Sequence, residues 1–349
     1  MINLYGQEIT KLETLLMARG QKKYRATQLY TWLYEKQASS FDEMSDVSKS
    51  FRDELNRDFC LNLPSIYKKQ ESSDGTIKLL LELEDGSKIE TAMLPYKYGN
   101  AICVTSQVGC NMGCSFCASG LLKKQRNLEA SEMVGQVLVM NKLLELKGER
   151  ITHIVVMGTG EPFDNYDNVL DFIRIVNHPK GLAIGARHIT VSTCGIVPGI
   201  MRYAEEGLQT NLAISLHAPN DEIRNKLMPI SKAYPMDKLM ESISYYEKHA
   251  QRRVTFEYIL LKGVNDSLEC ADQLAKLLNK GSTYIVNLIP YNPVAENSYM
   301  RSDDNSVHKF FSCLKKKHMN VTIRKEFGDD IDAACGQLRA KEYLHGKNN

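Results

Sequence analysis

The sequence predicts an α/β protein in which a parallel sheet curls into a partial barrel of six β/α units. A small helical domain and a β-hairpin are expected before it. From about residue 96 onward, six short apolar segments alternate with amphipathic helical segments, which is typical of a parallel sheet covered by helices. Apolar residues recur at helical spacing near the N-terminus, and an Asp-Gly turn separates two alternating segments within 76–94.

Residues 1–70 are expected to form the helical domain and to contact RNA. Leu12, Leu15 and Leu16 follow helical spacing, as do Leu29 and Trp32. The segment 24–32 mixes basic and aromatic side chains, a mixture that suits RNA contact. A small helical core around the single tryptophan is an equally good interpretation.

Residues 71–95 are expected to form a hairpin extension. Apolar residues alternate over 77–83, and the dipeptide Asp85-Gly86 favours a tight turn before a strand returns over 87–93. Glu90 lies on the returning strand.

The core barrel is expected over 96–335, with a C-terminal tail at 336–349. Right-handed crossovers between its strands would curl the sheet, and the working residues of such folds gather at the carboxyl ends of the strands. The expected strands are 102–107, 151–157, 188–192, 210–216, 254–261 and 284–289, with helices at 131–146, 166–177, 236–250 and 267–279. A last helix at 304–317 and a strand at 321–324 follow.

Composition narrows the setting in which the protein works. Lys and Arg number 44 against 42 Asp and Glu, so the net charge alone does not identify a nucleic-acid binder. No apolar run of about 18 residues occurs, and the N-terminus lacks a secretory pattern. The cysteines number 9 and accompany no export signal, which favours a reducing cytosol. We expect a cytoplasmic, monomeric protein without a membrane partner.

Three cysteines lie in one short loop, Cys110-x3-Cys114-x2-Cys117. Iron–sulfur clusters normally take four thiolates, so three thiolates would leave one iron open for chemistry, as catalytic zinc keeps an open position. Zinc and plain structural cysteines are the alternatives, but zinc usually takes paired C-x2-C units and no second pair follows. We therefore predict a [4Fe-4S] cluster. Phe116 is placed to lie against a flat group such as adenine.

Polar residues and a Gly-Glu pair follow successive strands of the predicted barrel. Each one alone is more often structural, but their regular placement favours a site for an adenosyl group. The residues are Gly160, Glu161, Ser192, Ser215, Leu216, His217 and Asn292.

The cysteine loop resembles the C-x3-C-x-aromatic-C motif of the radical S-adenosylmethionine (SAM) superfamily. Over nearly the full chain, the sequence resembles the RlmN/Cfr family of radical SAM RNA methyltransferases. This resemblance implies the radical SAM barrel, a cluster on Cys110, Cys114 and Cys117, and SAM held by the residues at the strand ends. It is carried by the cysteine loop with Gly160-Glu161-Pro162, 185–193, 226–230, 263–266 and 330–338.

The resemblance also implies a reaction: methylation of adenine C2 in 23S rRNA, at the peptidyl-transferase centre, and in tRNA 3′ of the anticodon. Two SAM molecules are used per turnover. One methylates Cys335 to S-methylcysteine, and the other yields a 5′-deoxyadenosyl radical that removes a hydrogen from that methyl group. The methylene radical adds to C2, Glu90 takes the C2 proton, and Cys103 forms a disulfide with Cys335 to release the RNA.

Alternatives remain open. A Cfr-type enzyme would methylate C8 of adenine in 23S rRNA and shares the cysteines, although the Gly-Glu-Pro loop resembles RlmN more. Another radical SAM enzyme would leave Cys103 and Cys335 unexplained, and a ferredoxin-like electron carrier needs no open iron. An inert buried thiol is the commonest fate of a free cysteine, which we assign to Cys60, Cys194, Cys270 and Cys313. The family also implies a reductant such as flavodoxin.

Overall fold

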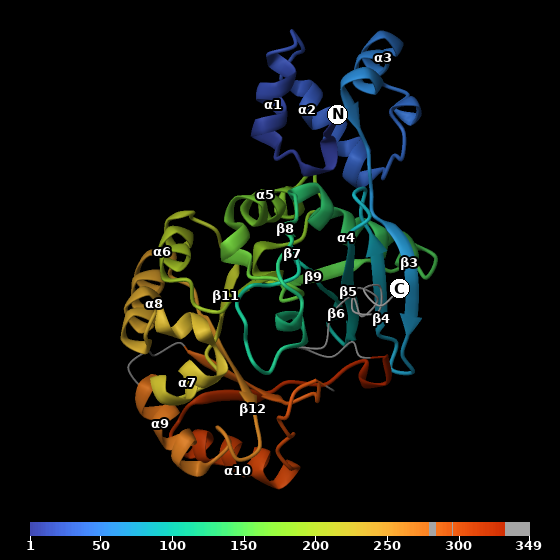
Figure 1. Cartoon of the computed structure of the whole chain (residues 1–349). Helices are drawn as coiled ribbons and strands as arrows, with labels where there is room; N and C mark the ends of the chain where they lie inside the picture. Colours follow the sequence, from blue (N-terminus) through green and yellow to red (C-terminus); the bar gives the residue numbers. More distant parts are fainter. Residues whose placement is uncertain (279–283, 295, 332–349) are drawn as a thin grey trace.

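The structure is a computed structural model that describes residues 1–278, 284–294 and 296–331. Figure 1 shows a compact N-terminal domain above a curled sheet, with the last described segments along the opposite end of the barrel. Cys335 and the tail at 336–349 lie outside the described residues.

Parallel strands form the barrel in the predicted order. Their neighbours run β6–β9–β10–β11–β12–β13–β14 within one 10-stranded sheet, and each of these pairs is parallel. The strands alternate between two environments: Val191 is buried in the main core, whereas Ser192 lines a central cavity. The bounds are β6 Gly99–Cys103, β9 Ile151–Val156, β10 Ile189–Thr193, β11 Asn211–Ser215, β12 Val254–Leu260, β13 Ile285–Pro290 and β14 Asn320–Ile323.

Helices cover the outside of the barrel (Figure 1). Two of them, α6 Val197–Glu205 and α7 Asp221–Leu227, were not expected. Both are short, α6 carries Pro and Gly in its first turn, and α7 is mostly charged, so neither has a clear helical pattern. The others match the expected segments: α4 Ala130–Glu145, α5 Tyr166–Asn177, α8 Met236–Ala250, α9 Leu268–Leu278 and α10 Asp304–Lys316.

The hairpin extension is continuous with the barrel. The strands β4 Ile77–Glu82 and β5 Lys88–Tyr96 pair antiparallel, and β5 pairs with β6. A further strand, β3 Ser65–Glu71, pairs with β4, so the expectation of helix throughout 1–70 is wrong at its end. Most side chains of β3 are exposed and several are charged, as befits an edge strand, so β3 lacks the apolar alternation that marks a strand.

The N-terminal domain is helical up to this strand. Its short strands β1 Ile2–Asn3 and β2 Phe59–Cys60 pair with each other. They precede and follow the helices in the sequence. The side chain of Trp32 is only 9% exposed, and its Nε1 donates to Asp46 at 2.5 Å, so the tryptophan belongs to the domain core. Tyr30 packs edge-on against His178 of the barrel. The helices are α1 Ile9–Met17, α2 Tyr24–Tyr30 and α3 Lys49–Asp58.

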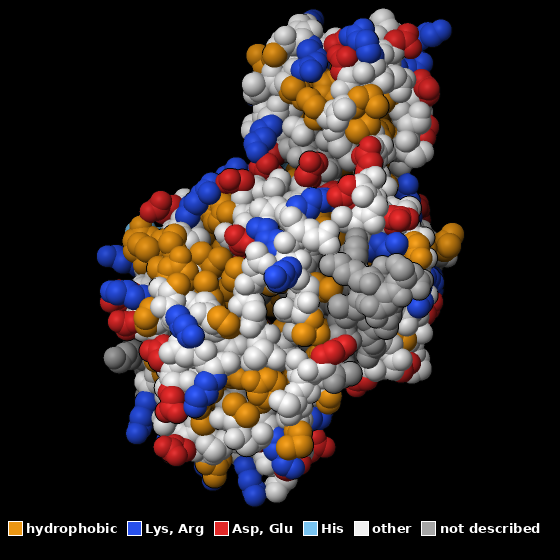
Figure 2. All heavy atoms as spheres, viewed as in Figure 1, with side chains coloured by type: hydrophobic (Ala, Val, Ile, Leu, Met, Phe, Trp, Pro, Cys, Tyr) orange, Lys and Arg blue, Asp and Glu red, His pale blue; other side chains and the backbone are white. Residues whose placement is uncertain are grey.

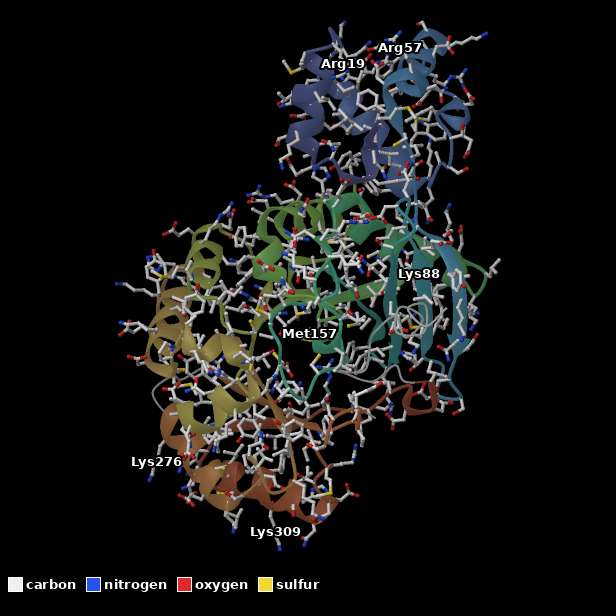
Figure 3. The ribbon with its side chains drawn as sticks, in the orientation of Figure 1. Arg19, Arg57, Lys88, Met157, Lys276 and Lys309 are labelled. Atoms are coloured by element: carbon white, nitrogen blue, oxygen red, sulfur yellow. The ribbon has the colours of Figure 1, made fainter. Side chains whose placement is uncertain are left out.

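Figure 3 labels residues in different parts of the chain. Met157, just past β9, lies centrally within the barrel, whereas Arg19 and Arg57 project from the N-terminal domain. Within the described part of the chain, no helix combines the length and apolar character needed to cross a bilayer.

Candidate functional site

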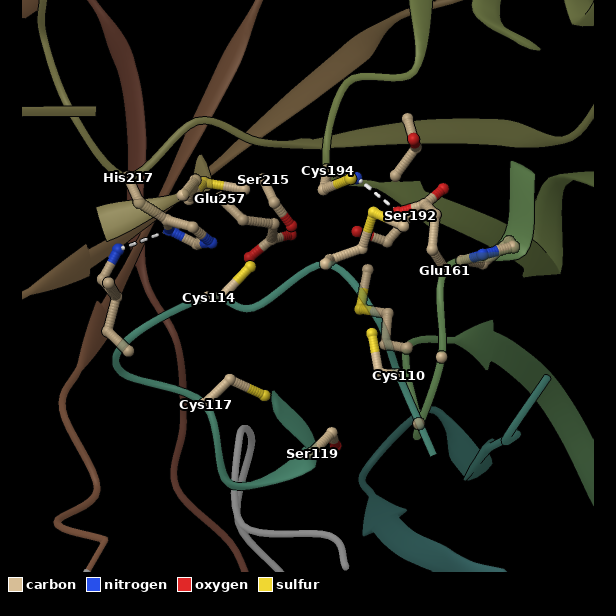
Figure 4. A pocket seen from close by; sticks show the side chains of 18 of the residues that line it. Cys110, Cys114, Cys117, Ser119, Glu161, Ser192, Cys194, Ser215, His217 and Glu257 are labelled. Carbon is tan, nitrogen blue, oxygen red and sulfur yellow. Dashed lines mark hydrogen bonds between the residues drawn. The ribbon is translucent and has the colours of Figure 1, made fainter. Parts of the chain in front are cut away.

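A cavity lies where the barrel strands end, and side chains from several strands and from the cysteine loop form its wall. Most of the predicted site residues meet there, around the space shown in Figure 4. The predicted residues that line it are Cys110, Phe116, Cys114, Cys117, Gly160, Glu161, Ser192, Ser215 and His217.

The cysteine loop curls over one side of this cavity. Gly109 has φ +76°, and a Cβ there would lie 2.2 Å from the carbonyl oxygen of Lys123, so only glycine fits the turn. The Cys110 amide donates to the carbonyl of Leu122 at 2.8 Å, and the Ser115 amide donates to that of Leu227 at 2.9 Å. These bonds anchor the loop while its three thiols face the cavity (Figure 4).

Burial disfavours the charged, thiolate form of these cysteines. It raises the pKa of Cys110 to about 11 and that of Cys114 well above its usual value, because desolvation disfavours the thiolate. Metal ligation supplies the positive charge that holds such thiols deprotonated, so the donor set fits an iron–sulfur cluster. Among the described residues no three His, Cys, Asp or Glu side chains converge on a single ion; thiolates of a four-iron cluster each bind a different iron.

The loop after β9 forms the opposite wall. Gly160 has φ +110°, and a Cβ there would meet the Gln107 side chain at 2.7 Å. The carboxylate of Glu161 accepts from the amide of Phe163 at 2.9 Å and from that of Cys194 at 2.7 Å. Burial nevertheless raises its pKa. The carboxylate is therefore held in place by backbone donors before any ligand arrives.

His217 is fixed in one orientation. It has φ +57°, and its Nδ1 accepts from the Ile259 amide at 3.1 Å, which leaves the ring proton on Nε2. Burial lowers its pKa to about 3, with the charge of Arg224 as a second cause, so the imidazole is neutral. Phe116 packs edge-on against it, with ring centroids 4.8 Å apart. The pair provides a flat apolar wall and one N–H donor.

Two predicted SAM contacts lie outside the cavity wall. Leu216 is buried in the main core because strand alternation turns it away from its neighbours Ser215 and His217. Asn292 is buried just past β13 but is not among the residues that line the cavity.

Cys194, Glu257 and Arg324 line the cavity but were not predicted to do so. Cys194, assigned to inert thiols, lines the cavity directly after β10. Glu257 on β12 is buried, accepts from the side chain of Asn287 at 2.9 Å, and lies 3.7 Å from Arg324. A lone acidic residue within the apolar run 254–261 was the available sign of this site.

Glu90 and Cys103 lie on a different surface, the face shared by β4, β5 and β6. Cys103 pairs opposite Ala92, and Glu90 is two residues away on the same strand face. Lys78 on β4 lies 3.6 Å from the Glu90 carboxylate, and both side chains are buried. Ile331 and Cys103 both pack against Ala92. The described chain thus ends beside Ala92, four positions before Cys335 in sequence.

Comparison with known proteins identifies the family. The chain is 55% identical to the probable dual-specificity RNA methyltransferase RlmN of Spiroplasma citri, over 98% of both chains. It is 56% identical to the protein of that name from Geobacillus thermodenitrificans, over 97% of this chain and 93% of the relative. The chain belongs to the RlmN family. The prediction made from the motifs is confirmed.

Other comparisons agree with membership of the RlmN family. Residues 104–277 match the radical SAM superfamily, and residues 2–61 match the ribosomal RNA large subunit methyltransferase N-terminal domain. A crystal structure of a radical SAM methyltransferase from Sphaerobacter thermophilus superposes with a TM-score of 0.92 at 42% identity, over 97% of this chain and 100% of that one. The predicted fold class is confirmed, as are the cofactors, a [4Fe-4S] cluster and SAM.

Proposed function

We propose that this protein is a radical SAM RNA methyltransferase that adds a methyl group to C2 of adenine in 23S rRNA and tRNA. One observation carries the proposal: three thiols and a backbone-held Gly160-Glu161 loop share one cavity in a chain 55% identical to a protein named as a dual-specificity RNA methyltransferase. We further propose a monomeric cytoplasmic enzyme supplied with electrons by a flavodoxin-type protein.

In this proposal Cys110, Cys114 and Cys117 hold the cluster, and the strand ends hold SAM. When bound together, these groups supply a 5′-deoxyadenosyl radical. Glu161 would accept hydrogen bonds from the SAM amino group, His217 would donate through Nε2, and Phe116 would pack on the adenine. Ser192 and Ser215 offer hydroxyls at the same wall. Each of these groups is positioned by backbone contacts, which favours tight orientation of the bound molecule.

Cys335 carries the methyl group, and Cys103 releases the product. The Cys335 thiolate attacks the methyl carbon of a SAM sulfonium and displaces S-adenosylhomocysteine, giving S-methylcysteine, because thiolate is the nucleophilic form. After carbon–carbon bond formation with the RNA, the Cys103 thiolate attacks the sulfur of Cys335. The sulfur–carbon bond to the RNA breaks and leaves its electron pair on the carbon, which takes up a proton to complete the methyl group. A disulfide forms between the two cysteines, and external thiols reset the pair. Ile331, four positions before Cys335 in sequence, packs against Ala92 as Cys103 does, which supports this pairing of the two cysteines.

Glu90 is the proposed base that takes the C2 proton. It lies on the same sheet face as Cys103, so one bound nucleotide can contact both side chains. The Lys78 ammonium 3.6 Å away favours the ionised carboxylate, which is the form that accepts a proton.

The N-terminal domain is the proposed RNA-contacting surface. Figure 2 shows basic and acidic side chains interspersed on it, so a few basic residues rather than the net charge would carry the contact. Lys23 pairs with Glu13 at 3.1 Å, and Arg25 donates to Gln28 at 2.6 Å and lies over the Tyr24 ring.

Replacing Lys22, Lys23 and Arg25 together by Gln should weaken RNA binding and reduce the slope of log K against log salt by up to about 2–3. Filter binding over a salt series measures both quantities. An unchanged slope would reject this surface.

The activity test uses anaerobically reconstituted protein, SAM, reductant, and 23S rRNA or tRNA transcripts. We expect 2-methyladenosine in digested RNA by mass spectrometry against synthetic standards. Formation of 8-methyladenosine instead would establish the Cfr-type alternative. Formation of 5′-deoxyadenosine with neither product would reject RNA methylation and leave another radical SAM reaction.

A further inference from the structure

Arg224 on α7 is a fully buried arginine directly behind the cavity wall, with an exposed fraction of 0%. It does not line the cavity but touches residues that do. Its Nη2 donates to the carbonyl oxygen of Cys194 at 2.7 Å, and its Nε donates to that of Leu216 at 3.3 Å. A weaker contact reaches the Ser215 carbonyl at 3.4 Å. One side chain thus joins the ends of β10 and β11.

The neighbouring backbone leaves room for this guanidinium. Gly195 has φ +103°, and a Cβ there would lie 3.2 Å from Nη2 of Arg224. Glycine is therefore favoured at position 195 for two reasons: it tolerates this dihedral angle, and it leaves space for the arginine side chain.

The charge of Arg224 has no counter-charge in direct contact. None of the ion pairs found among residues 1–278, 284–294 and 296–331 includes it, and its Nη1 is buried without a hydrogen-bond partner. Removing a cation from water without a partner is costly. Burial lowers the pKa of Arg224 from its ordinary value, and Cys194, Cys114 and Asp221 act in the opposite direction; the Asp221 carboxylate already accepts from the Met236 amide.

Cys114 is therefore the most telling neighbour, because a ligand cysteine is a thiolate when a cluster is bound. Carbonyl oxygens account for the remaining contacts of Arg224, and these are dipoles rather than charges. The buried guanidinium of Arg224 is therefore not compensated by negative charge until thiolates are present on the cavity side of the wall.

We propose that Arg224 is a positioning residue whose permanent positive charge offsets the negative charge of the cluster thiolates and makes the cluster easier to reduce. Reduction adds an electron to the cluster, so a nearby cation stabilises the reduced form more than the oxidised form. Arginine suits the role because it stays protonated when buried. The inference rests on the cluster assigned above.

The test compares Arg224→Gln with Arg224→Lys and with Lys226→Gln. Lys226 lies on the same helix, but its side chain is 68% exposed and pairs with Glu222, so its loss is the matched removal of one charge. Iron content and the visible spectrum first verify the cluster in each protein. The midpoint potential is then measured by redox titration followed by electron paramagnetic resonance.

For Arg224→Gln we expect the ratio of reduced to oxidised cluster at a fixed potential to fall at least about tenfold, a shift of about 59 mV to lower potential. Arg224→Lys at neutral pH and Lys226→Gln should stay close to wild type. Equal potentials in Arg224→Gln and Lys226→Gln would overturn the proposal. Absence of a cluster in the wild type would instead reject the proposed function.

If Arg224→Gln does not retain a cluster, Arg224→Lys alone decides. A buried lysine loses its proton more readily than arginine, so the potential of this variant should fall relative to wild type between pH 7 and pH 9. The neighbouring Cys194, Asp221 and His217 are common to both proteins, so their titration is removed by the comparison. Parallel pH dependence in the two proteins would overturn the proposal.

Discussion

The cavity wall and the face of the β4–β6 extension are held together in different ways. In the cavity, backbone amides fix the functional side chains: Glu161 accepts from the Cys194 and Phe163 amides, and His217 from that of Ile259. On the extension, Glu90 and Cys103 lie on adjacent antiparallel strands, and contacts from the distant segment 327–331 cover them.

That segment reaches the extension through only a few contacts. The Gly328 amide donates to Asp74, and Asp330 accepts from the Ser73 amide. Phe327 packs edge-on against Tyr96, and Ile331 packs against Ala92. The cavity is thus formed by the barrel strands and the loops that follow them, whereas residues 327–331, distant in sequence, pack on the extension. Generation of the radical and transfer of the methyl group should therefore be separable by mutation.

The largest expected effect separates the two regions outright. Cys335→Ala should keep 5′-deoxyadenosine formation but lower RNA methylation by at least ~1,000-fold, because the methyl carrier is gone. Cys114→Ala should abolish both products, because the cluster is lost. Chromatography of 5′-deoxyadenosine and mass spectrometry of the RNA measure the two quantities. Methylation by Cys335→Ala would show that the regions do not divide the reaction in this way.

Cys103→Ala should stall the reaction after the RNA is attached. Without the resolving thiol, the bond between Cys335 and the RNA persists, so we expect a retarded band on a denaturing gel and no second turnover. Cys313→Ala is the control, since Cys313 lies on α10, does not line the cavity, and donates through its thiol to the Asp272 carboxylate at 3.4 Å. A Cys103→Ala enzyme that turns over repeatedly without the band would remove the resolving role.

Lys78→Met tests whether the buried ion pair of Lys78 and Glu90 stabilises the extension. Removing one partner from the pair with Glu90, at 3.6 Å, should lower the free energy of unfolding by about 3 kcal/mol. RNA methylation should fall more than SAM cleavage. Lys88→Met on the same hairpin, whose 3.7 Å pair with Glu82 is more exposed, should cost less than about 1 kcal/mol. Chemical denaturation compares them, and equal losses would contradict the assigned role of burial.

The smallest effect concerns the pH dependence of the segment that covers the extension. Burial acts to raise the pKa of Asp74, but hydrogen bonds from Thr76 and Gly328 outweigh it and hold the pKa at about 2, below 3.8. The lower pKa in the folded state means that this stabilisation is complete above about pH 4 and is lost as the pH falls toward 2. Because Asp74 is exposed, the effect should stay below about 1 kcal/mol. Amide hydrogen exchange at Gly328 should respond in the wild type and not in Asp74→Asn.

The barrel could be predicted from sequence because each buried strand is a short apolar run. The expected strand at 254–261 matches β12 Val254–Leu260, and the helix expected at 166–177 matches α5. The edge strand β3 was missed because an exposed strand carries no apolar alternation. The cysteine loop was equally readable, because its ligands are close in sequence.

The residues missed at the site depend on contacts distant in sequence. Glu257 is an apparent flaw in an apolar strand until Asn287 and Arg324 are placed beside it. Arg224 lies in a short charged helix, where an exposed arginine is the ordinary expectation. Only the assembled strand ends, which offer it two carbonyl oxygens, distinguish it from its neighbour Lys226.

The unbroken ladder from β4 through β6 has a mechanical consequence. Glu90 and Cys103 lie on adjoining strands of it, two register positions apart, so one hydrogen-bonded sheet holds both. A nucleotide docked against this ladder would meet the proposed proton acceptor and the proposed attacking thiol on the same sheet face.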